Sequence, residues 1–456
     1  MKDTLKADSL GIMESIVMGI AGTAPAYSIE ITTSTIVNTA GTLSPAGILA
    51  CGLVMFGIVF AFVNLNRELP SAGTSYSWVS LAFGRTAGFF AGWALLVLCC
   101  VFMVSAMIPA ANATLLIFRP ALMNDVHWVT VIAALWLTFV SAVVVKGIKV
   151  TSYVQVAMTL VEALVLLAVI AASFMVFPAH PVRPFSWGWY NPFAFTPRLF
   201  ANSALVAIFF YYGWDVTMNL SEETKDRRRT PGRAAFWSMV FLMAFFLVFI
   251  TITLLGLTDG EIQHYNTNII FAVARKTLGP VWGYVAIVAV LLSTVGTVET
   301  QILQFTRTLF AKARAGALHP RYARLHPRWQ TPHVAVFLIW AGGLALLLAS
   351  SCLPTINVIL QDSITALGFQ ICFYLGLTGL ACAWRYRHGL SAGFAPALTR
   401  VVWPAASGLF MFFIALYSIP TFDRLTNAVG IGGILIGAIP LWLGRKRAVS
   451  APAPEG

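Results

Sequence analysis

The 456-residue sequence predicts an all-α polytopic membrane protein with about 12 transmembrane helices. Hydrophobic residues make up 59% of the chain and charged residues only 10%, against roughly 25% charged in an average soluble domain. A soluble protein of this size could not cover so much apolar surface with so few polar side chains. The apolar residues form continuous runs of about 20, which excludes a β-barrel of alternating polarity.

These runs define the predicted spans. In chain order they cover 12–37, 43–64, 86–112, 128–145, 150–176, 199–220, 236–257, 281–306, 333–351, 355–383, 401–419 and 428–444. The average of about 38 residues per span leaves no room for a separate soluble domain. Residues 1–11 and 445–456 are the predicted cytoplasmic N-terminal and C-terminal tails.

The distribution of cations predicts the orientation. About 23 of the 29 lysines and arginines fall on the side of the N-terminus, and none lies near the centre of a span. This bias predicts a multi-pass protein of the cell (plasma) membrane with both termini in the cytoplasm. The net charge of +12 therefore reflects topology, and we expect no nucleic-acid partner.

Two spans contain sequences that disfavour a continuous helix. Helix 1 reads GIAGTAPAY at 19–27, with two glycines and a proline within seven residues, and helix 6 reads FFYYGWD at 209–215. Breaks at matching positions of two five-helix halves indicate a transporter built from inverted repeats. The first repeat would cover 12–176 and the second 199–383, with two further helices at 401–444.

The predicted breaks have a defined chemistry. Unbonded N–H groups at the start of a half-helix attract a carboxylate, and unbonded carbonyls attract an ammonium group. Together they suit an amino acid, or an amine alone if the carboxylate subsite is unused. The aromatic side chains of helix 6 would cover the substrate or bind a cation. The predicted substrate-binding residues are Gly19, Ile20, Ala21, Gly22, Thr23, Ala24, Tyr27, Phe209, Phe210, Tyr211, Tyr212, Gly213 and Trp214.

Five carboxylates fall inside the predicted spans, namely Glu30, Glu162, Asp215, Glu299 and Asp362. Each charged side chain in a span costs about 2.5–3.5 kcal/mol on insertion scales, so we expect all five to face the protein interior. Removal from water favours the protonated form of a carboxyl group. These residues are therefore candidates for proton coupling or for attracting a cationic substrate. The alternative is a structural hydrogen bond to a neighbouring helix.

Enzymatic chemistry finds little support. The six cysteines show no CxxC or metal-ligand spacing, and the seven histidines lie in loops or at helix ends. No nucleophile–histidine pairing or phosphate-binding loop is present. We therefore predict no catalytic residues, no metal site and no cofactor.

Four motifs occur in order between the predicted spans. They read RELPSAGTSY at 67–76, KGIK at 146–149, GWD at 213–215 followed by EE at 222–223, and RTLF at 307–310 followed by TP at 331–332. On these motifs the chain resembles the amino acid–polyamine–organocation permeases over nearly its whole length. The resemblance implies a LeuT-like fold of five plus five inverted helices with two extra helices, and transport by alternating access.

The chain departs from that family at three places. The helix 1 break carries Pro25, Glu162 stands where many relatives carry a lysine that mimics a coupling cation, and Glu299 is an unusual acid in helix 8. The resulting hypothesis is a secondary active permease for an amino acid or related amine, driven by protonation of Glu162 or Glu299. A polyamine or other cationic-amine carrier and an amino acid exchanger are the alternatives. Membrane lipid is a further expected partner, near Arg307–Arg328, and the alternative is that these cations only set the topology.

Overall fold

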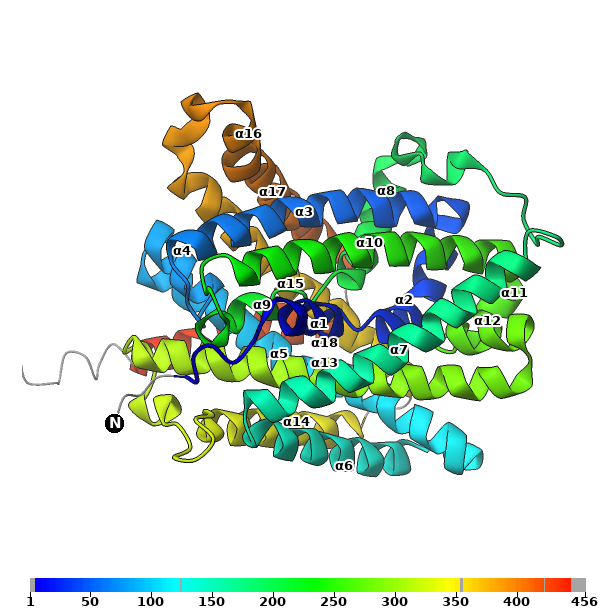
Figure 1. Ribbon diagram of the computed structural model, residues 1–456, viewed down its shortest axis with the longest axis horizontal. Coiled ribbons are helices and arrows are strands. Elements are labelled where there is room, and N and C mark those ends of the chain that lie inside the picture. The colour runs from blue at the N-terminus through cyan, green and yellow to red at the C-terminus, as the bar shows by residue number, and fades with distance from the viewer. Residues whose placement is uncertain (1–4, 124, 353–355, 422, 444–456) are drawn as a thin grey trace, which may run out of the picture.

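The computed structural model describes residues 5–123, 125–352, 356–421 and 423–443, without the side chains of 356–362, 365, 391, 392 and 421. The described residues form helices and connecting turns with no β-strand, which confirms the all-α prediction. The long helices lie side by side in one bundle (Figure 1).

Ten helical segments of the described residues are long and apolar enough to cross a membrane. They are Ile12–Glu68, Arg85–Phe118, Val126–Val145, Ile148–Val176, Thr230–Gly256, Pro280–Arg314, His333–Ser350, Ala366–Arg385, Phe394–Ser418 and Arg424–Leu443. The first segment crosses twice. Its two ends lie on the same side of the bundle, because the Leu10 N–H and the Asn66 side chain both bond to the loop that follows α9 (Val216–Asn219). One further crossing is formed by the broken helix of α8 (Pro197–Phe210) and α9, which brings the described crossings to the twelve predicted.

The named helices are bounded as follows: α1 Ile12–Thr23, α2 Pro25–Ala40, α3 Ser44–Glu68, α4 Ser75–Phe83, α5 Arg85–Phe118, α6 Val126–Val145, α7 Ile148–Val176, α8 Pro197–Phe210, α9 Val216–Asn219, α10 Thr230–Gly256, α11 Asp259–Tyr265, α12 Ile269–Leu278, α13 Pro280–Arg314, α14 His333–Ser350, α15 Ile356–Arg385, α16 Phe394–Ala397, α17 Trp403–Ser418, α18 Arg424–Asn427 and α19 Gly433–Leu435. Short 3-10 or π segments connect several of them, among them η1 Gly41–Leu43 and η8 Leu398–Val402.

Burial separates central from peripheral helices. The most apolar window of α5 is 83% buried, whereas those of α6, α7 and α14 are 39%, 33% and 28% buried. The exposed faces of the peripheral helices carry large apolar side chains such as Leu135, Leu164 and Phe337. An apolar outer face is what a lipid environment requires. The centre of the bundle, where α1 and α5 each pack against α13, therefore holds the polar groups discussed below.

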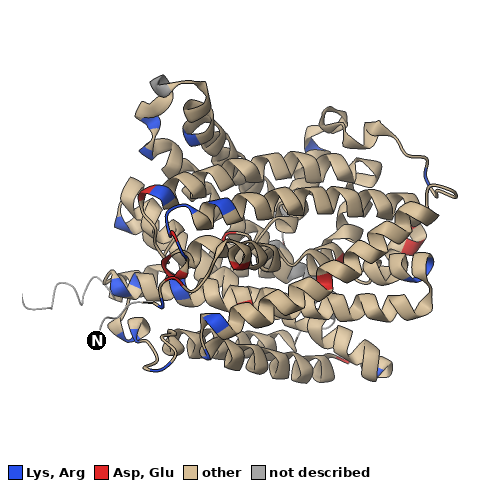
Figure 2. Cartoon of the chain, in the orientation of Figure 1, with Lys and Arg blue, Asp and Glu red and all other residues tan. Residues whose placement is uncertain are grey.

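One end of the bundle is rich in lysine and arginine (Figure 2). We call it the basic end and define it by the start of α1, the end of α3, the loop 220–229 and the end of α13. These four segments are joined directly, since Leu10 forms a β-bridge with Thr224, Asn66 donates to the Arg227 carbonyl, and Arg307 pairs with Glu223.

The structure corrects the predicted end of helix 8. Helix α13 continues to Arg314 instead of ending near residue 306, and it buries Arg307 and Lys312. Arg307 and Lys312, which the predicted span 281–306 left outside the helix, therefore lie in its final turns. Both charges are compensated inside the protein. Arg307 pairs with Glu223, while the Lys312 ammonium lies 3.8 Å from the Phe89 ring centroid and donates to the Phe89 carbonyl at 2.9 Å.

Candidate functional site

The break in helix 1 is a single residue. Helix α1 ends at Thr23, Ala24 adopts a left-handed conformation with φ 51°, and α2 begins at Pro25. Proline is favoured at the first position of a helix and cannot donate to a preceding turn. The local sequence therefore ends one helix and starts another in mid-membrane, as predicted.

The break in helix 6 is longer. Helix α8 ends at Phe210, residues 211–215 form turns, and Gly213 adopts φ 113°. A Cβ atom on Gly213 would lie 2.1 Å from the Gly22 carbonyl oxygen, and one on Gly22 would lie 2.3 Å from the Gly213 oxygen. No larger residue fits either position without displacing backbone. The structure thus brings the two predicted breaks into direct contact.

The N–H groups at the start of α2 are already hydrogen-bonded. Ala26 donates to Glu162 Oε1 at 3.0 Å, and Tyr27 donates to Ser293 Oγ at 3.3 Å. Pro25 has no N–H, so these are the first two donors of the half-helix. The expectation of unbonded N–H groups for a substrate carboxylate was therefore wrong for this conformation, because the Glu162 carboxylate occupies that position. A carboxylate is favoured there by the positive end of the helix dipole.

The carbonyls of the helix 6 break differ from those N–H groups. The Ile208 and Phe209 oxygens accept from the N–H groups of Tyr211 and Tyr212. The next three carbonyls, 210–212, receive no hydrogen bond from the described residues. Buried carbonyls without donors are suited to an ammonium group. The two halves of the predicted site therefore offer acceptors more readily than donors.

A ladder of polar groups continues from Glu162 along the interface of α7 and α13. With the Gln155 amide oriented so that both its ends are satisfied, its nitrogen donates to Glu299 Oε2 at 2.8 Å and its oxygen accepts from Thr159 Oγ at 3.2 Å. Gln155, Thr159 and Glu162 share one face of α7 because they are spaced by four and three residues. Glu299 is 2% exposed, and its Oε1 has no partner among the described residues.

A second polar network surrounds the helix 6 break. The Tyr212 hydroxyl donates to Gln301 Oε1 at 2.5 Å, and Gln304 donates to Asn219 Oδ1 at 3.4 Å. Asp215 borders this network at Gln304, and it accepts from the Tyr374 hydroxyl at 2.9 Å. Asp215 is therefore held by α15, while Glu162 and Glu299 face the α7–α13 interface.

The helix 6 aromatic side chains point in different directions. Phe210 and Tyr211 pack edge-on against Phe246 of α10, with ring centroids 5.2 and 5.6 Å away. Trp214 packs against Phe62 of α3 at 5.3 Å. These three rings hold the broken helix in the bundle, while Phe209 is 2% exposed and makes none of these ring contacts.

Tyr212 alone turns toward α5. Its ring lies 6.0 Å from Phe102, whose other neighbour is Tyr27 of α2 at 5.9 Å. Tyr212 and Tyr27 therefore approach the same ring from the two breaks. Phe102 of α5 therefore links the aromatic side chains of the two breaks.

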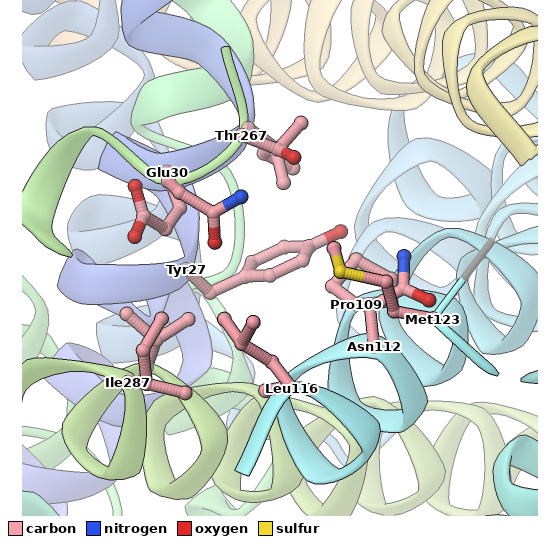
Figure 3. Close-up of a pocket in the computed structure, with 12 residues that line it drawn as sticks. Tyr27, Glu30, Pro109, Asn112, Leu116, Met123, Thr267 and Ile287 are labelled. Carbon is pink, nitrogen blue, oxygen red and sulfur yellow. The ribbon is translucent and has the colours of Figure 1, made fainter. Parts of the chain in front are cut away.

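Glu30 lies toward the opposite end of the bundle from the basic end. Its Oε2 accepts from the Ile270 N–H at 3.0 Å and caps the start of α12. Glu30 lines a cavity of about 50 Å³, which Tyr27 crosses and which Asn112 of α5 closes on the far side (Figure 3). A cavity this small holds water rather than an amino acid. At the breaks themselves, the backbones of Gly22 and Gly213 are in direct contact.

The other predicted residues of helix 1 contact neighbouring helices or bond within their own helix. Gly19 contacts α10, since a Cβ there would lie 2.5 Å from Ser238 Oγ, and Ala21 is buried. The Thr23 hydroxyl bonds within its own helix, to the Gly19 carbonyl at 3.4 Å. Ile20 lines a small cavity together with Glu162 and Thr159. The remaining candidate, Asp362, falls within α15, but its side chain lies outside the described residues.

Two ion pairs close the basic end. Arg307 binds Glu223 through two hydrogen bonds of 2.9 Å, and both side chains are 1% exposed. Arg314 binds Glu222, which also accepts from the Ala72 N–H at 2.9 Å. Burial raises the pKa of Glu222, but the bonds from Arg314 and Ala72 outweigh it and leave the pKa below its usual value.

The sequence interpretation missed the polar residues of α13 that contact the breaks. Besides Ser293 and Gln301, the Thr297 hydroxyl donates to the Gly22 carbonyl at 2.8 Å. Ser293, Thr297, Gln301 and Gln304 follow a spacing of four, four and three residues, which places them on one helix face. This polar stripe within an apolar span was the available signal. No group of three His, Cys, Asp or Glu in the described part of the chain is arranged to bind a metal ion.

Comparison with known proteins agrees with this geometry. The chain matches the family described as "Amino acid permease" over residues 11–439. It is 25% identical to human Asc-type amino acid transporter 1 over 88% of this chain and 78% of that protein. It is 22% identical to the serine/threonine exchanger SteT of Bacillus subtilis over 66% of this chain and 67% of that protein.

A third relative is named for an amine. The low-affinity putrescine importer PlaP of Escherichia coli is 26% identical over 65% of this chain and 66% of that protein. The family match extends from the start of α1 to beyond α19 and includes both helix breaks. The chain therefore belongs to the amino acid permease family, within the amino acid–polyamine–organocation permeases.

Proposed function

We propose that the protein is a secondary active permease that moves an amino acid or related amine across the membrane by alternating access, coupled to protons. The observation that carries the proposal is the contact of two mid-membrane helix breaks beside a buried carboxylate, Glu162. Irregular backbone at this depth is tolerated where it lines a binding site. No catalytic activity is part of the proposal.

The basic end faces the cytoplasm in the proposed orientation. The positive-inside rule then places both termini in the cytoplasm of a cell (plasma) membrane protein. The ion pairs Arg307–Glu223 and Arg314–Glu222 close the cytoplasmic side in the described conformation. Inward release of substrate requires these contacts to separate.

Glu162 couples protonation to binding because of where its carboxylate lies. An ionised Glu162 holds the N–H groups at the start of α2 and prevents a second carboxylate from approaching them. A proton on Glu162 removes the charge and weakens its attraction to the helix dipole. The α2 donors then become available to the carboxylate of an amino acid.

The proton leaves toward the basic end through the polar ladder of α7 and α13. Gln155 lies about 10 Å nearer the start of α7 than Glu162, at the helical rise of about 1.5 Å per residue. Thr159 lies between them, and Glu299 accepts from Gln155. Glu299 is then the second proton site, and its unpartnered Oε1 is the atom that receives the proton.

A cationic-amine substrate is the second candidate. The specific observation in its favour is that the α2 donors are satisfied by Glu162 and Ser293, whereas the carbonyls of 210–212 have no donors among the described residues. An amine without a carboxylate needs only the carbonyl oxygens of 210–212. The putrescine importer among the relatives agrees with this alternative.

Uptake into proteoliposomes tests both candidates. Radiolabelled amino acids and putrescine are offered with and without an imposed proton gradient, acid outside. The proposal requires saturable accumulation that disappears when a protonophore collapses the gradient. Inhibition by putrescine but not by zwitterionic amino acids would select the amine carrier.

Two substitutions test the carboxylates directly. Glu162→Gln keeps an oxygen that can accept from Ala26, and Glu299→Gln keeps the shape of the side chain, so both variants should fold. Each should retain binding but lose accumulation driven by the gradient. Asp8→Asn, at an exposed position before α1 whose positive φ asparagine tolerates, is the control and should behave as wild type. Unchanged proton dependence in both buried variants would contradict the coupling role.

A further inference from the structure

A cavity of about 260 Å³ lies at the basic end, between α3, α10 and η8, away from the helix breaks. Its floor is aromatic and aliphatic. The Phe60 ring lies 6.1 Å from Phe236 and 5.2 Å from Trp403. We call this cavity the α3–α10 groove. It is about five times larger than the cavities beside Glu30 and Glu162.

The rim of the groove is cationic. Arg67 stands one turn beyond Val63 on α3, and Arg233 follows Gly232 on α10, where a Cβ on the glycine would lie 3.3 Å from Val63. The two helices therefore touch at the floor, and both arginines line the space above it. Among the described residues, neither guanidinium forms a hydrogen bond or ion pair with the protein. The neighbouring acid, Glu68, is already paired with Arg385.

The groove has an apolar floor, as in the membrane interior, and a polar rim, as at the membrane–water boundary. Asn64 ties its walls together by donating to the carbonyls of Phe60 and Thr399. Trp237 lies on the rim with 54% of its surface exposed. Tryptophan is typical of the membrane–water boundary, and arginine binds phosphate oxygens in pairs. Cationic side chains over an apolar floor match a molecule with an anionic head and a hydrocarbon tail.

We propose that the α3–α10 groove binds an anionic phospholipid, with its phosphate on Arg67 and Arg233 and the upper part of its acyl chains on Phe60 and Phe236. The two arginines lack protein partners because the lipid phosphate supplies their charge balance. The site is independent of the transport proposal, since none of its residues belongs to the helix breaks.

Native mass spectrometry of the full-length protein in detergent tests the site. The probes are phosphatidylglycerol and phosphatidylcholine with identical acyl chains, and glycerol 3-phosphate as the free head-group anion. The test variant is Arg67→Gln/Arg233→Gln. The matched control, Lys146→Gln/Lys149→Gln, removes the same charge from exposed positions where α6 connects to α7, outside the groove and outside the Arg307–Arg328 segment. Thermal unfolding checks that each variant is folded, and the single substitutions Arg67→Gln and Arg233→Gln replace the double variant if it is not.

The expected result is preferential retention of phosphatidylglycerol by the wild type and the control, with roughly tenfold weaker affinity in the test variant. Equal affinity in the test variant and the wild type would overturn the proposal. Equal losses in the test and control variants would show a general charge effect and also overturn it. Retention of phosphatidylcholine at the same level, or binding of glycerol 3-phosphate as tightly as the lipid, would rule out an anionic phospholipid site.

Discussion

Gly22 of α1 and Gly213 of the helix 6 break lie backbone against backbone, each with its carbonyl oxygen where the Cβ of the other would be. The contact joins two segments that are 191 residues apart in the chain (213 − 22). It also leaves no room for a substrate between these two residues. In the proposed transport cycle, the two breaks therefore separate at this point.

Substitution of either glycine by alanine should disrupt this contact. A Cβ at 2.1–2.3 Å from a carbonyl oxygen forces the backbone apart, and alanine at the Gly213 φ of 113° is strained as well. We expect Gly22→Ala and Gly213→Ala to lose about 1–3 kcal/mol of stability and most of the uptake activity. Thermal unfolding and the initial rate of uptake measure the two effects. Gly260→Ala, with no heavy atom within 4 Å of the added Cβ, is the control and should match the wild type.

Substitution of Gln155 should reduce proton-driven uptake while leaving substrate exchange intact. Gln155→Met keeps the length of the side chain but removes the donor to Glu299 and the acceptor for Thr159. Proton-driven accumulation should fall at least about tenfold, because the path between the two carboxylates is interrupted. Exchange of internal for external substrate, which needs no net proton movement, should be retained. Met158→Leu on the same helix is the control, and a parallel loss of exchange in Gln155→Met would favour a purely structural role.

The buried pair Arg307–Glu223 should contribute strongly to stability. Arg307→Met leaves the Glu223 carboxylate buried without its partner, at an expected cost of about 3–5 kcal/mol. The double variant Arg307→Met/Glu223→Leu should recover much of the loss, since no unpaired charge remains. Thermal unfolding in detergent measures both. Arg385→Met breaks an exposed pair with Glu68 and should change the unfolding temperature little; an equal loss there would contradict the importance of burial.

Glu222 predicts a dependence of stability on acid pH. Its pKa is lowered in the folded protein, so its contribution is present above the ordinary value of 4.5 and is lost as the pH falls through the lower, folded value. Glu222→Gln should therefore be less stable than the wild type near neutral pH, and the difference should shrink below pH 4.5. Unfolding temperatures of both proteins from acid to neutral pH test this. A constant difference across that range would show that the Arg314 and Ala72 bonds do not depend on ionisation.

The sequence predicted the features that depend on local composition. The membrane spans, the helix 1 break at Ala24–Pro25 and the helix 6 break at Gly213 follow from apolar runs, proline and glycine. Burial of Glu30, Glu162, Asp215 and Glu299 follows from the cost of exposing acids to lipid. The division into two inverted repeats and the functional roles of the candidate residues stay predictions.

Features set by packing between distant helices were less accessible. The sequence gives no indication that Glu162 caps α2, because the bond joins residues 136 positions apart. The three directions taken by the helix 6 aromatic side chains depend on Phe246, Phe62 and Phe102, which lie on three other helices. The burial of Lys312 depends on Phe89 in the same way. In each case the contact depends on how distant helices pack, which the residue spacing within one helix does not determine.

The carboxylate that Glu162 offers to the start of α2 bears on the return step of the transport cycle. A transporter whose backbone N–H groups are satisfied only by bound substrate cannot reorient without substrate, so it exchanges one substrate molecule for another. Here the protein fills that position with its own side chain, so the unloaded form has a low-energy compact state. Under the proposed mechanism, such a carrier can reorient without bound substrate, which favours net transport over obligatory exchange.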